Sequence, residues 1–336
     1  MKPGFRVDIA MLRLLAITTV VAFHAYGMCY VESHIPSPIC QQYKDTYEWF
    51  NQHVPINVAM PLFMFISGYL FGMQLLKGKY SSLWQVIKDK SIRIALPYYL
   101  FLPIMMATYS GFSIEPYYTG GYWHMWFLPA LWWLFIVSYL LKPLIYSDRF
   151  MIVGCLLFAS YVITLFGHFL PNIFGLSHLN LMLCYFMAGM VVFKHEERLT
   201  DIFKYWHLVY PLTFIYLLTI IFFPTTYGDI SIPLLVGSTC AILVLWYLFR
   251  IIPWQHFLIT PYLLTLSTYS FGIYIFHNWV EVYLVSTTAK RLFPIVEFAE
   301  AHIYIFPLLF SVAAFVISAF LTKLILMTKM GRRLIG

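Results

Sequence analysis

Long apolar stretches recur along the whole chain, and short segments that carry most of the charge separate them. Each stretch approaches the roughly 20 residues that a helix needs to cross a bilayer. The pattern predicts an all-α polytopic bundle of about ten transmembrane helices, formed by a single integral-membrane domain over residues 1–336. The predicted spans are residues 7–30, 55–76, 91–110, 125–141, 150–167, 177–193, 208–223, 232–250, 262–285 and 303–327.

The positive charges divide unequally between the two sides of these spans. If the N-terminus lies in the cytoplasm, most Lys and Arg residues fall in inner segments, with the largest group before the third span. The outer loops then hold only Lys44, Lys290 and Arg291. The positive-inside rule requires this asymmetry, so both termini are predicted to be cytoplasmic.

The composition agrees with a membrane protein. The chain is 61% hydrophobic and 10% charged, with a mean hydropathy of +0.78, whereas a soluble domain needs more surface charge. The net charge of +7 comes from span ends and does not indicate nucleic-acid binding. Five cysteines are too few for a disulfide scaffold, although Cys29 and Cys40 flank one outer span end and could pair in an oxidising compartment.

Two ionisable residues bracket the apolar run "RLLAITTVVAFH" of the first span. Eleven residues at about 100° each place Arg13 and His24 on one helix face, roughly 16 Å apart along the axis. An intramembrane arginine usually faces a cavity or a partner, but Arg13 could also extend to the inner headgroups. His24 could hydrogen-bond a neighbouring helix, or it could act as a general base in a cavity.

Two further stretches place histidines near the outer face. "HMWFLPALWW" begins with His124, and Trp126 beside it could stack on a sugar ring or belong to an aromatic belt. "YSFGIYIFHNWVEVY" contains Tyr274 and places His277 and Glu281 four residues apart. That spacing allows a direct His277–Glu281 contact that would fix the imidazole tautomer, and a purely structural buried pair is the alternative.

The densest basic cluster precedes the third span, in "KDKSIRIALPYY". Lys88, Lys90 and Arg93 there could form a cytoplasmic phosphate site for a nucleotide-bearing cofactor, or they could serve topology and anionic lipids. In the second span, Ser67 and Gly68 permit close helix approach, and the hydroxyl offers a polar contact. No zinc-ligand spacing, glycine-rich phosphate loop or nucleophile elbow occurs in the sequence.

Taken in order, these stretches resemble the acyltransferase 3 family of integral-membrane O-acyltransferases. The resemblance rests on the arginine and histidine of the first span, "PLFMFISGYLF", Lys90-x-x-Arg93, "HMWFLPAL" and "YSFGIYIFHNW". The chain is similar to the single-domain members that act on surface sugars. Family members often have an aspartate three residues before the arginine, where this chain has Ala10, with Asp8 two residues earlier. Lys90 stands where arginine is common.

The resemblance implies transfer of an acyl group, usually acetyl, from cytoplasmic acyl-CoA to a hydroxyl of an extracytoplasmic glycan or lipid-linked sugar. Acetyl-CoA would be the co-substrate, without a metal, in a bacterial inner membrane. His24 would take the acceptor proton or carry the acyl group, and Arg13 would steer or polarise the donor. The implied roles of the other residues are catalysis for His277 and Glu281, phosphate binding for Lys88, Lys90 and Arg93, and acceptor binding for Ser67, His124, Trp126 and Tyr274.

A transporter or exporter of a glycan or a small acylated compound is the alternative interpretation, because buried charge also marks transport pathways. No inverted repeat is recognisable in the sequence, which disfavours a transporter. The expected partners are membrane lipids and the sugar acceptor, and nucleic acid is not expected.

Overall fold

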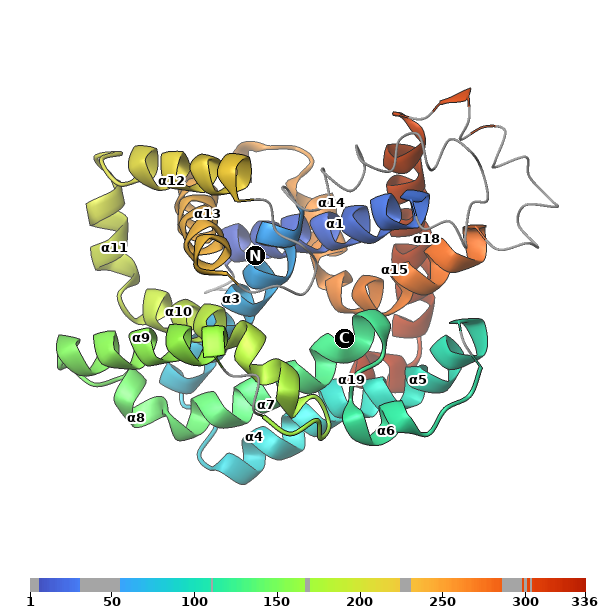
Figure 1. Cartoon of the computed structure of the whole chain (residues 1–336), viewed down its shortest axis with the longest axis horizontal. Coiled ribbons are helices and arrows are strands. Elements are labelled where there is room, and N and C mark those ends of the chain that lie inside the picture. Colours follow the sequence, from blue (N-terminus) through green and yellow to red (C-terminus); the bar gives the residue numbers. More distant parts are fainter. Residues whose placement is uncertain are drawn as a thin grey trace.

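The computed structural model describes residues 6–30, 55–109, 111–166, 170–223, 231–285, 298, 301–302 and 304–336. Within these ranges the chain forms helices joined by turns, with no strand, which confirms the all-α prediction (Figure 1). The described elements are α1 (Val7–Tyr30), α3 (Pro55–Leu76), α4 (Leu83–Lys90), η1 (Ser91–Ala95), α5 (Leu96–Tyr109), α6 (Glu115–Thr119), η2 (Trp123–Trp126), α7 (Phe127–Leu140), α8 (Lys142–Ile145), α9 (Phe150–Phe166), η3 (Leu176–His178), α10 (Leu179–Lys194), α11 (Glu196–Phe203), α12 (Val209–Phe222), α13 (Ile232–Ile251), η4 (Trp254–His256), α14 (Thr260–Thr268), α15 (Ser270–Val285), α18 (Phe306–Leu326) and α19 (Lys329–Leu334).

Each predicted span coincides with one or more of these helices. Six described helical segments are long and apolar enough to cross a membrane, and α9 and α12 are shorter apolar helices. The protein is therefore a multi-pass membrane helix bundle, while the number of ten crossings stays a prediction. Four predicted spans cover more than one element: the third is part of the run α4–η1–α5, the fourth and sixth begin in the 3₁₀ turns η2 and η3, and the ninth divides into α14 and α15. The predicted Cys29–Cys40 pair falls outside the described side chains.

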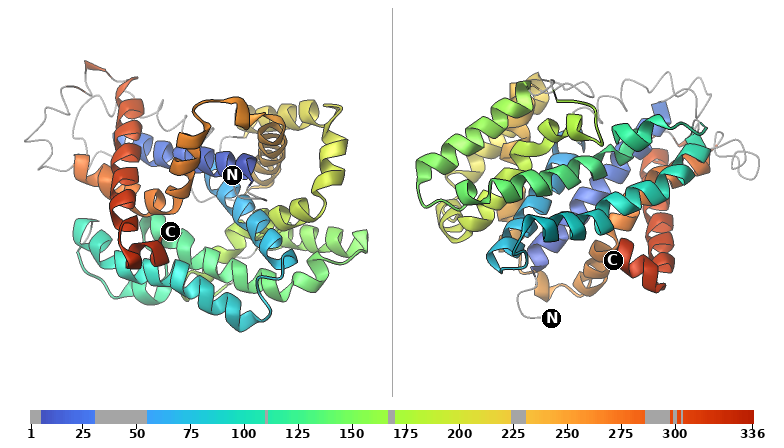
Figure 2. Two further views of the ribbon diagram at one scale, coloured as in Figure 1. Left: turned by 180° about the vertical axis from the view of Figure 1, so that it is seen from behind. Right: turned by 90° about the horizontal axis from the view of Figure 1, so that it is seen from below.

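Helix α1 lies in the middle of the bundle and contacts α3, α13, α14, α15 and α18 (Figure 1). The first turns of α1 and the short helix α19 lie in the lower half of the right-hand view of Figure 2. These two segments, both predicted on the inner side, therefore lie toward the same end of the bundle. The cytoplasmic placement of that end stays a prediction.

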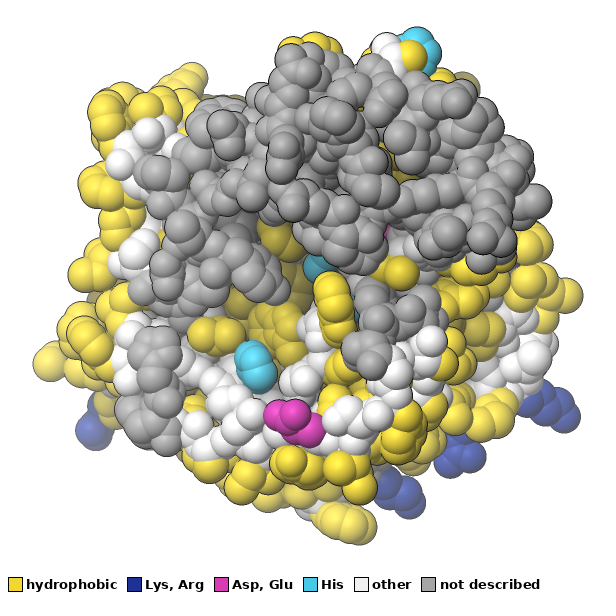
Figure 3. Space-filling view, turned by 45° about the vertical axis from the view of Figure 1, so that its right-hand side comes forward, with side chains coloured by type: hydrophobic (Ala, Val, Ile, Leu, Met, Phe, Trp, Pro, Cys, Tyr) yellow, Lys and Arg dark blue, Asp and Glu magenta, His cyan; other side chains and the backbone are white. Residues whose placement is uncertain are grey.

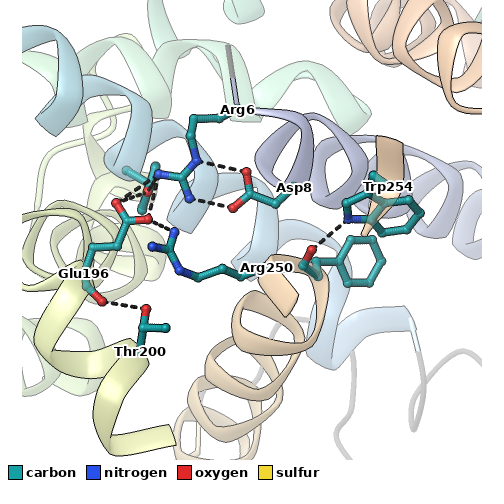
Figure 4. A network of polar contacts seen from close by, with 8 residues as sticks. Arg6, Asp8, Glu196, Thr200, Arg250 and Trp254 are labelled. Atoms are coloured by element: carbon teal, nitrogen blue, oxygen red, sulfur yellow. Dashed lines mark hydrogen bonds and ion pairs between the residues drawn. The ribbon is translucent and has the colours of Figure 1, made fainter. Parts of the chain in front are cut away.

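A polar network joins four of these inner segments (Figure 4). Arg6 binds Asp8 through Nε and Nη2, at 2.9 and 2.5 Å, and its Nη1 lies 2.7 Å from Glu196 Oε1. The same carboxylate accepts a hydrogen bond from the Tyr69 hydroxyl at 2.7 Å and pairs with Arg250. The network joins the start of α1 to α3, α11 and α13. Within it, Asp8 forms its ion pair with Arg6.

Two glycines let α3 and α10 approach each other backbone to backbone. A Cβ added to Gly68 would overlap the carbonyl oxygen of Phe186, and one added to Gly189 would overlap that of Phe65. Because hydrocarbon gives no hydrophobic drive between helices, such close contact supplies the packing energy. The predicted close approach at Gly68 is confirmed.

We expect Gly189→Ala to destabilise the bundle by about 1–3 kcal/mol, because the added methyl group meets backbone that cannot rotate away. Thermal unfolding of the purified protein in one detergent measures the effect. Gly154→Ala is the matched control, since nothing lies within 4 Å of a Cβ at Gly154 on α9. Equal melting temperatures for the two variants would contradict the packing argument.

Candidate active site

Three histidines from distant parts of the chain meet inside the bundle. His24 comes from α1, His124 from η2 and His277 from α15. The ring centroid of His277 lies 5.1 Å from that of His24 and 5.0 Å from that of His124, and the third pair is 6.1 Å apart. We call these residues the histidine cluster. His124 and His277 are 5% and 0% exposed, whereas His24 is half-buried and is the most accessible of the three.

Hydrogen bonds to the backbone determine which ring nitrogen of each buried histidine carries the proton. His277 Nδ1 lies 2.8 Å from Tyr274 O, and His124 Nε2 lies 3.2 Å from Ile275 O. A carbonyl oxygen only accepts, so each of these nitrogens is the N–H donor. In a neutral ring the other nitrogen then keeps its lone pair. His277 Nε2 and His124 Nδ1 are both buried, and neither has a hydrogen-bond partner within the part of the chain that the structure describes.

The backbone around His124 is held in an unusual conformation. Trp123, the residue before it, has φ of 43°, in the left-handed region that side chains other than glycine rarely adopt. The Tyr274 hydroxyl donates to His124 O, so α15 contacts both the main chain and the ring of His124. Strained residues persist where the surroundings overdetermine them, and they concentrate at functional sites.

Glu281 lies one turn beyond His277 on α15 and is fully buried. The predicted hydrogen bond between the two residues is not formed, because the Nδ1 proton of His277 is directed to the carbonyl oxygens of its own helix. Glu281 Oε2 instead accepts from Asn278 Nδ2 at 3.4 Å, and its Oε1 has no partner among the described residues. Glu281 is therefore a buried carboxyl group beside the histidine cluster.

Arg13 lies on the same unbroken helix as His24, so the predicted shared face is present in α1. Its Nε and Nη2 lie 3.3 and 3.2 Å from the Ser267 hydroxyl oxygen, which is on α14. None of the ion pairs among the described residues involves Arg13. Sequence reasoning missed Ser267, because nothing in an apolar helix tells which serine faces another helix.

The basic cluster before the third span divides into exposed and buried members. Lys88 and Arg93 are exposed, and Arg93 Nε pairs with Asp89 at 3.3 Å. Lys90 is 7% exposed, and its Nζ lies 3.9 Å from the ring centroid of Phe135. The π-helical segment η1 begins at the next residue, and such segments are common at functional sites.

Two more aromatic rings complete the surroundings of Lys90. Its Nζ is 5.6 Å from the Tyr80 ring and 5.7 Å from the Phe71 ring, within the range of cation–π attraction. Burial lowers the pKa of Lys90 to about 7, and the Asp89 carboxylate 3.8 Å away opposes the shift. This arrangement disagrees with the predicted phosphate contact, because aromatic rings enclose the ammonium group.

Of the three remaining predicted residues, Tyr274 lies beside the histidine cluster, whereas no described contact joins Trp126 or Ser67 to it. Tyr274 is beside it, with ring centroids 5.7 Å from His124 and 5.9 Å from His277. Trp126 stacks on His178 at 5.2 Å, and none of its described ring contacts reaches the cluster. Ser67 is half-buried on α3. Figure 3 shows histidine side chains in and beside a hollow lined mostly by hydrophobic side chains, with Lys and Arg along the lower margin.

Apolar spanning helices around a buried group of histidines define a multi-pass membrane protein with an intramembrane polar site. A family model described as an acyltransferase domain matches residues 6–327, which is nearly the whole chain. The chain therefore belongs to the acyltransferase 3 family, and it is an acyltransferase that moves acyl groups other than aminoacyl groups. Comparison with curated proteins found no match, and comparison with solved structures found none.

Proposed function

We propose that the protein moves an acetyl group from cytoplasmic acetyl-CoA to a hydroxyl of an extracytoplasmic glycan or lipid-linked sugar in a bacterial inner membrane. The observation that carries the proposal is the pair of unpartnered ring nitrogens, His124 Nδ1 and His277 Nε2, next to the half-buried His24. A hydroxyl group needs a base before it can attack a thioester, and unprotonated imidazole nitrogen is suited to that task.

In the proposed reaction the acceptor oxygen attacks the thioester carbonyl carbon while His24 removes the hydroxyl proton. The tetrahedral intermediate then collapses, the carbon–sulfur bond breaks, and the proton passes from the imidazolium to the leaving thiolate. His24 is assigned this role because it is the most accessible ring of the cluster. The lone pairs of His124 and His277 would stabilise the transient positive charge on His24.

The donor would be bound from the opposite end of the bundle. Lys88 and Arg93 are exposed there and can contact the cofactor phosphates. Arg13 lies between that end and His24, about 16 Å from His24 along α1, so its guanidinium could steer the donor toward His24. One helix would then carry both a group that guides the donor and the group that activates the acceptor.

The test uses purified protein in lipid nanodiscs with acetyl-CoA labelled in the acetyl group and a crude surface-glycan fraction. We expect label to appear in the glycan, in an ester that mild base removes. Labelled palmitoyl-CoA in parallel reports the length of acyl chain accepted. Folded protein that transfers no label from either donor, but moves acetylated glycan across proteoliposomes, would contradict acyl transfer to a glycan and favour an exporter.

Arg93 and Lys90 should respond differently to removal of their charge. We expect Arg93→Gln to raise KM for acetyl-CoA about tenfold, because a charge-assisted bond to phosphate contributes about 1.5–3 kcal/mol. Lys90→Met should leave KM unchanged within about threefold, since Lys90 faces aromatic rings. Steady-state kinetics with varied acetyl-CoA measures both, and equal increases in KM would mean that Lys90 also reaches the cofactor.

A further inference from the structure

We propose that Ser267 is a positioning residue that holds the Arg13 guanidinium within the membrane in place of a carboxylate. The proposal rests on the proposed role of Arg13 toward the acyl donor, and the experiment below tests that role separately. Ser267 is on α14, 254 residues from Arg13 in the chain, and is 1% exposed.

The Ser267 hydroxyl forms three hydrogen bonds, and all three join α14 to α1. Its proton goes to Ala10 O at 2.7 Å, and its oxygen accepts from Arg13 Nε and Nη2 at 3.3 and 3.2 Å. The directions are unambiguous, because a guanidinium only donates and a carbonyl only accepts. One hydroxyl thus joins the side chain of Arg13 to the backbone one turn earlier on the same helix.

This bonding differs from that of most serine and threonine hydroxyls in the described helices, although Thr164 on α9 also donates to another helix, at Asn180 O. Serine and threonine in an apolar helix usually donate to a carbonyl of their own helix. Thr18 donates to Leu14 O and Ser311 to Pro307 O, both four residues back. Ser267 donates to α1 instead, so its hydroxyl is directed to the neighbouring helix that carries Arg13.

The local backbone explains why Ser267 can face α1. Helix α14 ends at Thr268 and α15 begins at Ser270, so Ser267 lies in the last turn before an interruption. The Ser270 hydroxyl donates to Ser267 O at 2.7 Å, so the first residue of α15 holds this carbonyl by a side-chain hydrogen bond. Ser267 is therefore fixed through its carbonyl from one side and through its hydroxyl from the other.

Because Ser267 is uncharged, its hydrogen bonds leave the positive charge of Arg13 in place. The nearest acidic residue on α1, Asp8, already binds Arg6, and no described carboxylate pairs with Arg13. Ser267 fixes two N–H groups of the guanidinium without neutralising it, so the positive charge remains available to an anionic acyl donor that passes Arg13. A carboxylate at the same place would orient Arg13 and also cancel the charge that acts on the donor.

The experiment compares Ser267→Ala, Ser267→Thr, Arg13→Ala and the double variant Ser267→Ala/Arg13→Ala in the acetyl-transfer assay. We expect Ser267→Ala to lower kcat/KM about tenfold or more, because a hydrogen bond to a charged group is lost. Ser267→Thr keeps the hydroxyl and should stay within about threefold of wild type. Ser267→Ala should have no further effect once Arg13 is absent.

Ser311→Ala is the matched control, since it removes a buried hydroxyl that bonds only within its own helix. If Ser267→Ala does not fold, Ser267→Cys carries the same test, because a thiol bonds weakly at similar volume. Full activity of folded Ser267→Ala together with an inactive Arg13→Ala would overturn the proposal and leave the proposed function intact. A fully active Arg13→Ala would overturn the role of Arg13 and, with it, the role of Ser267.

Discussion

Replacing His24 by alanine should lower the rate of acyl transfer by about 10²–10⁴-fold, the range typical for loss of a general base or acid. His24 is half-buried and lies 5.1 Å from His277 between ring centroids, so the other two histidines are too enclosed to take over its contact with the acceptor. We expect the KM for acetyl-CoA to change little, because Lys88 and Arg93, which we propose bind the cofactor phosphates, lie in the segment that leads into the third predicted span, far along the chain from His24.

The measurement is the turnover of labelled acetyl transfer in nanodiscs, with protein folding checked by thermal unfolding. His256→Ala on η4 is the matched control, since it removes an exposed histidine distant in sequence from the cluster. His24→Gln separates basicity from shape, because glutamine keeps polar atoms but cannot accept a proton at neutral pH. Retention of wild-type turnover by both His24 variants would remove His24 from the mechanism.

Replacing Glu196 by glutamine should destabilise the inner end of the bundle by about 3 kcal/mol, because two arginines lose the carboxylate that pairs them. The side chain of Glu196 is 13% exposed, and those of Arg6 and Arg250 are 23% and 25% exposed, so water compensates only in part. Glutamine keeps a single acceptor oxygen, so Tyr69 and the two arginines would compete for it. We expect a lower unfolding temperature and a reduced yield of folded protein.

The neighbouring residue supplies the control for this variant. Glu197→Gln makes the same chemical change one position later, at an exposed side chain that forms no ion pair within the described part of the chain. Its unfolding temperature should equal that of wild type. If Glu196→Gln and Glu197→Gln unfold at the same temperature, the network shown in Figure 4 contributes no stability.

Much of the helical architecture could be predicted, because the bilayer itself sets the length of an apolar run. The interruption between Thr268 and Ser270 could not, since residues 262–271 contain no proline or glycine that would mark it. Among the site residues, His24 and His277 are conspicuous as polar positions in apolar stretches. Their meeting with His124 depends on which helices are neighbours, and apolar periodicity carries no such information.

The burial of Lys90 was equally inaccessible to sequence reasoning. Its aromatic surroundings come from Phe71, Tyr80 and Phe135, on three separate segments. In the sequence, Lys90 is one of several basic residues in a single polar segment. Nothing there distinguishes its expected exposure from that of Lys88 or Arg93. The charge pattern could therefore predict the side of the membrane, but not which member of the cluster turns inward.

The glycine contact between α3 and α10 also determines which helices can move relative to each other. Backbone packed against backbone at Gly68 and Gly189 leaves no flexible side chains to absorb sliding, so these two helices form a rigid frame. In the proposed reaction the donor and the acceptor arrive from opposite sides, so parts of the bundle would have to separate and close again. That motion would fall to helices outside this frame.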